Sequence, residues 1–190
     1  MFFRRCLLIP MVIIILIALL SVAPHVKTYH ILMTLGLIIC AIGDYTLQWF
    51  VVGLSFFLLG HVFYISAFLK TKERKPPTAL LIGLLVYGVI MAGIITGGLL
   101  KDGDIIMGIA VLAYICVIMT MGLTAWRTNC IFAIIGSLLF IVSDSILALN
   151  KFTVSIPYAG VYIMVTYYAA QLLLALSISK YSVIRNKVVQ

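Results

Sequence analysis

The chain has 190 residues, of which 65% are hydrophobic and only 9% are charged, whereas soluble globular proteins average about 45–50% apolar and about 25% charged residues. With so few polar residues to cover its surface, an ordinary soluble domain is excluded, and so is a disordered chain. The net charge of +8 does not indicate nucleic-acid binding, because almost all of the thirteen Lys and Arg residues lie between apolar runs or at the two ends.

Seven apolar stretches approach the length of about 20 residues that a membrane-spanning helix needs. They predict an all-α fold, a polytopic transmembrane helix bundle in which residues 1–190 form a single integral membrane domain. The second and third stretches adjoin without a polar linker, so we expect a tight turn around Val51, Val52 and Gly53, beside Trp49. The predicted spans lie near residues 7–23, 31–50, 51–69, 78–99, 105–126, 130–149 and 158–179.

The first stretch also has features of a cleavable signal peptide. Arg4 and Arg5 precede it, and small residues at 21–23 follow it. Its apolar part is long for a signal peptide, however, and Pro24 would come directly after the cut. The sequence therefore favours a retained helix.

The distribution of basic residues predicts the orientation of the chain in the membrane. Seven spans place the loops alternately on two sides, and one side receives nine Lys and Arg residues while the other receives four. The positive-inside rule then predicts a cytosolic C-terminus and an extracytoplasmic or lumenal N-terminus, although Arg4 and Arg5 favour the opposite. A bacterial chain would lie in the plasma membrane and a eukaryotic one in the endoplasmic reticulum.

Two acidic residues lie inside predicted spans, where charged side chains are costly and usually functional. Asp44 is in the second span and Asp144 in the sixth, and each lies close to the same, outer end. Both occur in a small-Asp-x-x-Leu context, which hints at an internal duplication. The alternative is that each carboxyl group only caps a broken helix or binds a hydroxyl on a neighbouring helix.

Further polar residues accompany the two acids. His61 lies in the third span with Tyr64 one turn later, and Gln171 shares a helix face with Tyr167 and Tyr168. Near two carboxyl groups, His61 is a candidate for a general acid–base or orienting role, although a lone His can also serve a plain interhelical hydrogen bond.

A metal site is not expected, because His61 with two Asp makes a thin ligand set. The remaining two His residues, His25 and His30, flank the start of the second span, far from the acids. The four Cys residues are scattered without a CxxC motif and are expected to act as small apolar side chains.

Three polar residues are expected at the outer end of the spans. Asn150 and Lys151 follow Asp144 by six and seven residues, and Arg5 begins the first span on the same side. Each cation alone fits ordinary contact with lipid headgroups. Together, two cations above two buried carboxyl groups describe a mouth that could hold a phosphodiester, with an acyl-like tail below it.

Several of these segments together resemble the lysoplasmalogenase family of membrane hydrolases. The segments occur in the order typical of that family and cover most of the chain from the second span onward. They are Gly43-Asp44-x-x-Leu47, Phe57-Leu58-Leu59-Gly60-His61-Val62-Phe63-Tyr64-x-x-Ala67-Phe68, Ser143-Asp144-Ser145-x-Leu147-Ala148-Leu149-Asn150-Lys151-Phe152 and Thr166-Tyr167-Tyr168-Ala169-Ala170-Gln171-Leu172-Leu173. Members usually have eight spans, so this chain looks one short at its start, and Arg5 stands where the family has a Lys.

The resemblance implies hydrolysis of the vinyl-ether bond of lysoplasmalogens, which gives a fatty aldehyde and glycerophosphocholine or glycerophosphoethanolamine. This reaction needs an acid that protonates carbon and a carboxylate that stabilises positive charge, and two carboxyl groups in a low-dielectric site do not readily ionise together. We favour Asp144 as the acid and Asp44 as the stabiliser or base, although the reverse assignment also fits the sequence. No cofactor is implied.

The remaining site residues would orient the substrate. His61, Tyr64, Tyr168 and Gln171 would position water and the headgroup side of the lipid, with Tyr167 beside them. Other function classes stay open on the sequence: a metal-dependent membrane lipid amidase, a seven-span receptor, or a proton-coupled transporter that uses the paired acids.

Overall fold

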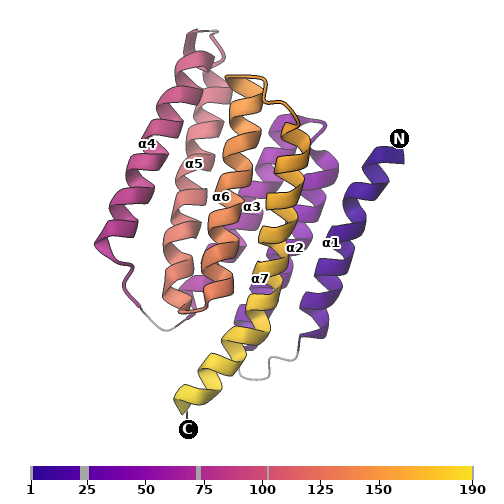
Figure 1. The fold of residues 1–190 in the computed structure, drawn as a ribbon, viewed down its shortest axis with the longest axis vertical. Helices are drawn as coiled ribbons and strands as arrows, with labels where there is room; N and C mark the ends of the chain where they lie inside the picture. The colour runs from indigo at the N-terminus through magenta and orange to yellow at the C-terminus, as the bar shows by residue number, and fades with distance from the viewer. Residues whose placement is uncertain (1, 22–25, 72–73, 102, 190) are drawn as a thin grey trace.

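The computed structural model describes residues 2–21, 26–71, 74–101 and 103–189, with side chains over 8–21, 26–71, 74–99 and 103–184. Within these residues, seven α-helices and one short 3₁₀ turn confirm the predicted all-α bundle, and the long helices run alternately up and down (Figure 1). The elements are α1 (Phe2–Leu20), α2 (Lys27–Thr46), α3 (Phe50–Leu69), α4 (Thr78–Lys101), α5 (Ile105–Ala125), η1 (Trp126–Thr128), α6 (Ile131–Phe152) and α7 (Ala159–Val189).

Six helices in the described part of the chain are long and apolar enough to cross a membrane, which identifies an integral multi-pass membrane protein. The apolar part of α1 that the structure describes, Leu8–Leu20, is shorter than a full span of about 20 residues. Large apolar side chains cover the outside of the bundle, as expected for a surface that faces lipid. The six spans are Lys27–Thr46, Phe50–Leu69, Thr78–Leu99, Ile105–Thr128, Ile131–Phe152 and Ala159–Ile184.

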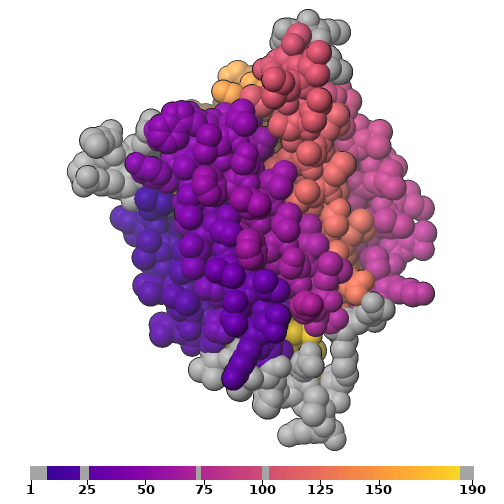
Figure 2. Space-filling model, turned by 180° about the vertical axis from the view of Figure 1, so that it is seen from behind, coloured from indigo at the N-terminus to yellow at the C-terminus, as the bar shows by residue number. Residues whose placement is uncertain are grey.

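The helices form two closely packed pairs, α2 with α3 and α6 with α7, while α1 packs against α2 and α7. Helix α5 contacts α3, α4 and α6, and the reverse face of the molecule shows α5 running between α3 and α4 (Figure 2). We call the two ends of the bundle the mouth end and the basic end. The mouth end carries residues 47–49 and 153–158, and the basic end carries residues 70–71, 74–77 and 126–130 (Figure 1).

The turn between α2 and α3 lies slightly earlier than the sequence suggests. Helix α2 ends at Thr46 and α3 begins at Phe50, so the turn is at residues 47–49 rather than around Val51–Gly53. Gly53 lies instead in the first turn of α3, where a Cβ atom would approach the Cα atom of Leu47 to 2.6 Å. The glycine therefore allows the returning chain to pack closely against the turn, although it is not itself the turn.

Local sequence signals define several other helix ends. Pro76 and Pro77 come directly before α4, where a missing backbone N–H is tolerated. The Asp104 side chain caps the start of α5 by accepting a hydrogen bond of 3.2 Å from the Met107 amide. Helix α7 extends about ten residues beyond the predicted span of 158–179, past the rest of the bundle at the basic end (Figure 1).

Candidate active site

Both predicted acidic residues lie inside the bundle, and each has a tyrosine partner from another helix. Asp44, in the last turn of α2, accepts a hydrogen bond of 3.0 Å from the Tyr167 hydroxyl on α7. Asp144, on α6, accepts one from the Tyr114 hydroxyl on α5. The two carboxyl groups are close enough to interact electrostatically. The structure thus brings together two acids that are one hundred positions apart in the sequence.

Asp44 stands at the end of a chain of hydrogen bonds. The Tyr64 hydroxyl donates to Gln171 Oε1 over 2.7 Å, Gln171 Nε2 donates to the Tyr167 hydroxyl over 3.1 Å, and Tyr167 donates to Asp44. Tyr64 and Gln171 are both 0% exposed, so each depends on these bonds for its polar atoms. Every donor points toward Asp44, the direction in which neighbouring bonds polarise one another to stabilise negative charge.

Close packing of α2 against α3 places Tyr64 in this chain. Gly36 on α2 faces the Tyr64 ring, and a Cβ atom at Gly36 would overlap that ring. Small residues allow membrane helices to approach closely in this way. Tyr167 and Gln171 lie one turn apart on α7, as the i, i+4 spacing predicts. The Cys40 thiol lies beside Tyr64 and Gln171, one turn before Asp44.

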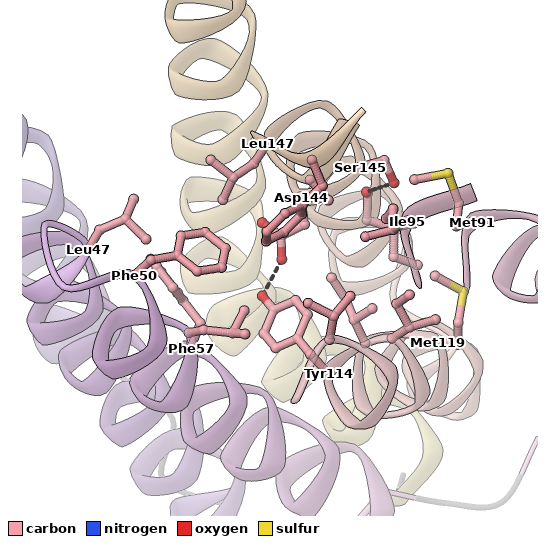
Figure 3. A pocket seen from close by; sticks show the side chains of 17 residues that line it. Leu47, Phe50, Phe57, Met91, Ile95, Tyr114, Met119, Asp144, Ser145 and Leu147 are labelled. Carbon is pink, nitrogen blue, oxygen red and sulfur yellow. Dashed lines mark hydrogen bonds between the residues drawn. The ribbon is translucent and has the colours of Figure 1, made fainter. Parts of the chain in front are cut away.

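Asp144 faces a different environment, an apolar cavity enclosed by α3, α4, α5 and α6. The cavity contains about 630 Å³ of empty space, part of it open to the outside. Figure 3 shows Asp144 and Tyr114 joined across it, with Leu47, Phe50 and Phe57 on one side and Met91, Ile95 and Met119 on the other. The other lining residues are Leu54, Val111, Ile115, Ile118, Ile141, Ser145, Leu147, Ala148 and Phe152. Asp44 does not line this cavity.

An aromatic cluster of Phe57, His61 and Phe140 separates the two acidic regions. The His61 ring is edge-on to Phe140 and Tyr114, with ring centroids 4.5 Å and 5.4 Å apart, and Phe140 is in turn edge-on to Tyr167 at 5.4 Å. His61 is fully buried, and neither of its ring nitrogens reaches hydrogen-bond geometry, although the backbone of Phe57 lies close. The structure therefore sets His61 against the ring of Tyr114.

The predicted outer residues have separate positions. The Lys151 ammonium lies 5.4 Å from the centre of the Phe50 ring, which lines the cavity, so Lys151 is at the cavity mouth. Asn150 accepts a hydrogen bond of 2.9 Å from the Ile156 amide and so holds the loop after α6. Arg5 belongs to α1, but its side chain is not among those that the structure describes.

A family model described as the YhhN family matches residues 5–178 of this chain. The chain belongs to the YhhN family. The lysoplasmalogenase TMEM86A of Bos taurus is 37% identical to it over 157 residues, which are 75% of this chain and 62% of the relative. The protein of the same name from Homo sapiens is 36% identical over 157 residues, again 75% and 62%. The lysoplasmalogenase TMEM86B of Sus scrofa is 32% identical over 157 residues, 76% and 62%.

These matches confirm the family resemblance seen in the sequence. The aligned part of the chain corresponds to less than two thirds of the length of these relatives. No solved structure gives a significant match to the chain.

One residue of this YhhN-family site, Tyr114, is not among those that the sequence singles out. It is the one tyrosine in the run of residues 105–126, and a phenolic hydroxyl in an apolar span needs a partner. That signal could have drawn attention to Tyr114, but not to Asp144 as its partner. The same applies to Tyr87, whose hydroxyl donates to Ser145 Oγ over 2.7 Å at the cavity wall.

Side chains that commonly bind metals are dispersed in the described part of the chain. His30 Nε2 lies 2.8 Å from the Ala18 carbonyl oxygen near the end of α1, and His30 is at the opposite end of α2 from Asp44. His61 belongs to the aromatic cluster. Among the described residues, no group of three or more His, Cys, Asp or Glu side chains comes together. His25 lies outside the described residues.

Proposed function

We propose that this chain hydrolyses the vinyl-ether bond of lysoplasmalogens, releasing a fatty aldehyde and glycerophosphocholine or glycerophosphoethanolamine. The names of its relatives support this substrate class. The observation that carries the proposal is a carboxyl group, Asp144, on the wall of a largely apolar cavity that is partly open to the outside, within a membrane bundle. Such a cavity suits a lipid, and a carboxyl group supplies the acid that a vinyl ether requires.

The reaction begins with transfer of the Asp144 proton to the β-carbon of the vinyl ether. The electrons of the double bond form the new C–H bond, and positive charge spreads over the α-carbon and the ether oxygen. Water then adds to the α-carbon, and its proton returns to a carboxylate, which leaves a hemiacetal. Cleavage of the bond to the glycerol oxygen, which takes up a proton, releases the aldehyde. One water molecule is consumed.

We assign Asp44 to the stabilisation of positive charge rather than to proton donation. It interacts electrostatically with Asp144 but does not line the cavity, so its effect on the substrate acts across a distance. The hydrogen-bond chain from Tyr64 through Gln171 to Tyr167 directs its donors toward Asp44, which favours negative charge on that carboxyl group. This difference between the acids supports the assignment of Asp144 as the acid.

The remaining predicted residues then divide into three roles. Tyr64 and Gln171 support Asp44, because their polar groups are used within the chain and are fully buried. His61 holds the ring of Tyr114, whose hydroxyl orients Asp144. Tyr168 is half-buried beside Tyr167 and interacts electrostatically with Asp44, so it is the tyrosine of this pair that we expect nearest to bound water.

Product analysis of the purified chain in detergent tests the proposal. A lysoplasmalogen and an ester lysophospholipid with the same headgroup and tail should be compared by mass spectrometry. We expect fatty aldehyde and glycerophospho-base from the vinyl ether and no cleavage of the ester. In D₂O, aldehyde reduced at once to the alcohol should carry one deuterium on the carbon next to the former carbonyl, because protonation occurs at that position.

Two results would contradict the proposal. Equal cleavage of the ester lipid would indicate a general lysophospholipase. Release of aldehyde without deuterium at that carbon would exclude protonation of the vinyl ether as the first step. The Asp144→Asn variant, purified in the same way, controls for contaminating hydrolases.

We also propose that residues 1–190 act as one membrane domain with the mouth end extracytoplasmic or lumenal and the basic end cytosolic. The support is the excess of Lys and Arg at the basic end. Reporter tags at the two termini should give opposite results in a protease-protection assay. In intact bacterial cells only the C-terminal tag should be protected. In sealed microsomes, whose cytosolic face is outside, only the N-terminal tag should be protected. Equal accessibility of both tags would place the two termini on the same side of the membrane, which would contradict the odd number of spans.

A further inference from the structure

A second apolar hollow lies between α4 and α5, on the lipid-facing side of the bundle. It contains about 680 Å³ of empty space, part of it open to the outside. Its one lining hydroxyl, on Thr120, already donates to the Cys116 carbonyl over 2.7 Å, so the groove offers no unpaired hydroxyl donor. The residues that line this α4–α5 groove are Leu81, Leu84, Leu85, Gly88, Val89, Ala92, Leu112, Ile115, Cys116, Met119, Thr120 and Leu123.

The α4–α5 groove adjoins the Asp144 cavity. Ile115 and Met119 line both hollows, so the two share one wall on α5. Across from Met119, α4 presents Gly88, where a Cβ atom would lie 3.2 Å from the Met119 Cγ atom. The glycine keeps the groove from being filled at this point, and the flexible Met119 side chain forms the boundary between the two spaces.

The two hollows together are long enough to hold one lipid tail. On α4, the lining runs from Ile95 in the Asp144 cavity to Leu81 in the groove, fourteen residues apart in the sequence and so about 21 Å along a helix. Half of the hydrocarbon core, the depth that one lipid tail occupies, is about 15 Å. The groove also leads away from Lys151 and the mouth, toward the basic end of the bundle (Figure 1).

We propose that the α4–α5 groove binds the hydrocarbon tail of a single-tailed lipid whose head end lies at the Asp144 cavity. The inference rests on the proposed function for the identity of that lipid. The headgroup lies at the mouth beside Lys151, the bond next to the tail lies at Asp144, and the tail passes Met119 into the groove. Recognition of the tail is by apolar contact and length, and Gly88 and Met119 set the length that fits.

Variants of α4 test the tail site through its dependence on chain length. A tail of about eight carbons is shorter than half of the hydrocarbon core, about 15 Å, and an extended tail of about eighteen carbons is longer. Gly88→Leu should raise KM for the long tail roughly tenfold and leave the short tail within about twofold, because only the long tail reaches the groove. Gly93→Leu is the matched control, since a Cβ atom there meets nothing within 4 Å. Met119→Ala should shift the preference the opposite way, toward longer or bulkier tails.

A binding measurement separates failure of the tail site from failure of the proposed function. A saturated, non-hydrolysable ether lysolipid with a photoreactive group at the tail end should label α4 and α5 within residues 81–92 and 112–123. Long-tailed competitors should prevent labelling and Gly88→Leu should reduce it. Labelling without vinyl-ether hydrolysis would support the groove while overturning the proposed function. Hydrolysis with no labelling there and no change in length dependence in either variant would overturn the groove.

Discussion

The surroundings of Asp44 and Asp144 differ although their local sequences are alike. Asp44 is held by Tyr167, which is linked to two further side chains that are fully buried. Asp144 is held by Tyr114 and opens onto an apolar cavity. The difference comes from neighbouring helices rather than from the residues adjacent to each acid. Two acids in similar contexts can therefore take different roles, one in proton transfer and one in charge stabilisation.

The largest effect is expected from removal of either carboxyl group. Asp144→Asn should lower kcat by at least the roughly 10²–10⁴-fold that is typical of a lost acid–base group. Asp44→Asn should lower kcat by a similar factor, because it removes the carboxylate that stabilises positive charge in the same step. The double variant should be little worse than the poorer single variant, because the two groups act in one step. A solvent deuterium isotope effect should accompany wild-type turnover if protonation limits the rate. Steady-state kinetics in detergent measures these effects.

Folding of the two Asn variants is the necessary control. Asn preserves the shape of Asp and removes an ionisable group that is costly in the membrane, so neither variant should lose thermal stability. A folded variant with nearly normal kcat would return that acid to a structural, helix-pairing role. If both variants behaved in this way, the acid-catalysed mechanism would be wrong.

Phe variants of the two tyrosine partners should distinguish the surroundings of the two acids by their effects on kcat and Tm. Tyr114→Phe removes a hydrogen bond to the Asp144 carboxylate that forms as the proton is transferred. A bond to a charged group contributes about 1.5–3 kcal/mol, so kcat should fall about 10- to 100-fold. Tyr167→Phe also leaves Gln171 Nε2 without its acceptor, which costs about 1–3 kcal/mol of stability. We therefore expect a clear fall in Tm for Tyr167→Phe and a smaller one for Tyr114→Phe.

Tyr162→Phe is the matched control for both, because Tyr162 is on α7 and is 52% exposed on the outside of the bundle. It should leave kcat and Tm unchanged. Equal losses of kcat and Tm in both Tyr114→Phe and Tyr167→Phe would contradict the separation of the two acidic regions.

Much of this fold can be predicted from sequence because the signals that define its helices lie within each helix and at its ends. Long apolar runs identify the helices, and proline or a capping Asp marks several ends. The α2–α3 turn is harder, because Gly53 looks like a turn residue and instead allows close packing against Leu47. Such a role depends on which backbone atoms approach it, and that is decided by the packing of two helices.

The site is predictable only as a set of residue types. The two acids, the tyrosines and Gln171 stand out because polar groups are costly in an apolar span. Their partners do not, since Tyr114 meets Asp144 only after α5 packs against α6. The cavity is not predictable from sequence either, because four helices contribute apolar residues that do not stand out in any one span. Sequence thus indicates that chemistry is present, while helix packing decides which acid faces the substrate.

The smallest expected effect concerns the mouth of the Asp144 cavity. Lys151, in the last turn of α6, lies over the Phe50 ring. A similar contact occurs at the basic end, where the Lys180 ammonium lies 5.7 Å from the centre of the Phe132 ring at the start of α6. Lys151→Gln should raise KM about two- to fivefold, the range for one exposed charge interaction, and lower kcat less, because a headgroup contact is similar in the ground and transition states.

The wild-type KM should rise with salt, and that of Lys151→Gln should rise less, because salt screens an exposed charge. Lys180→Gln, which removes a lysine from a similar ring contact at the other end of the bundle, should change neither KM nor its salt dependence. Equal effects of the two variants would indicate a general attraction between a cationic protein and anionic lipid. A fall in kcat alone for Lys151→Gln would instead assign Lys151 to the chemical step, together with Asp144.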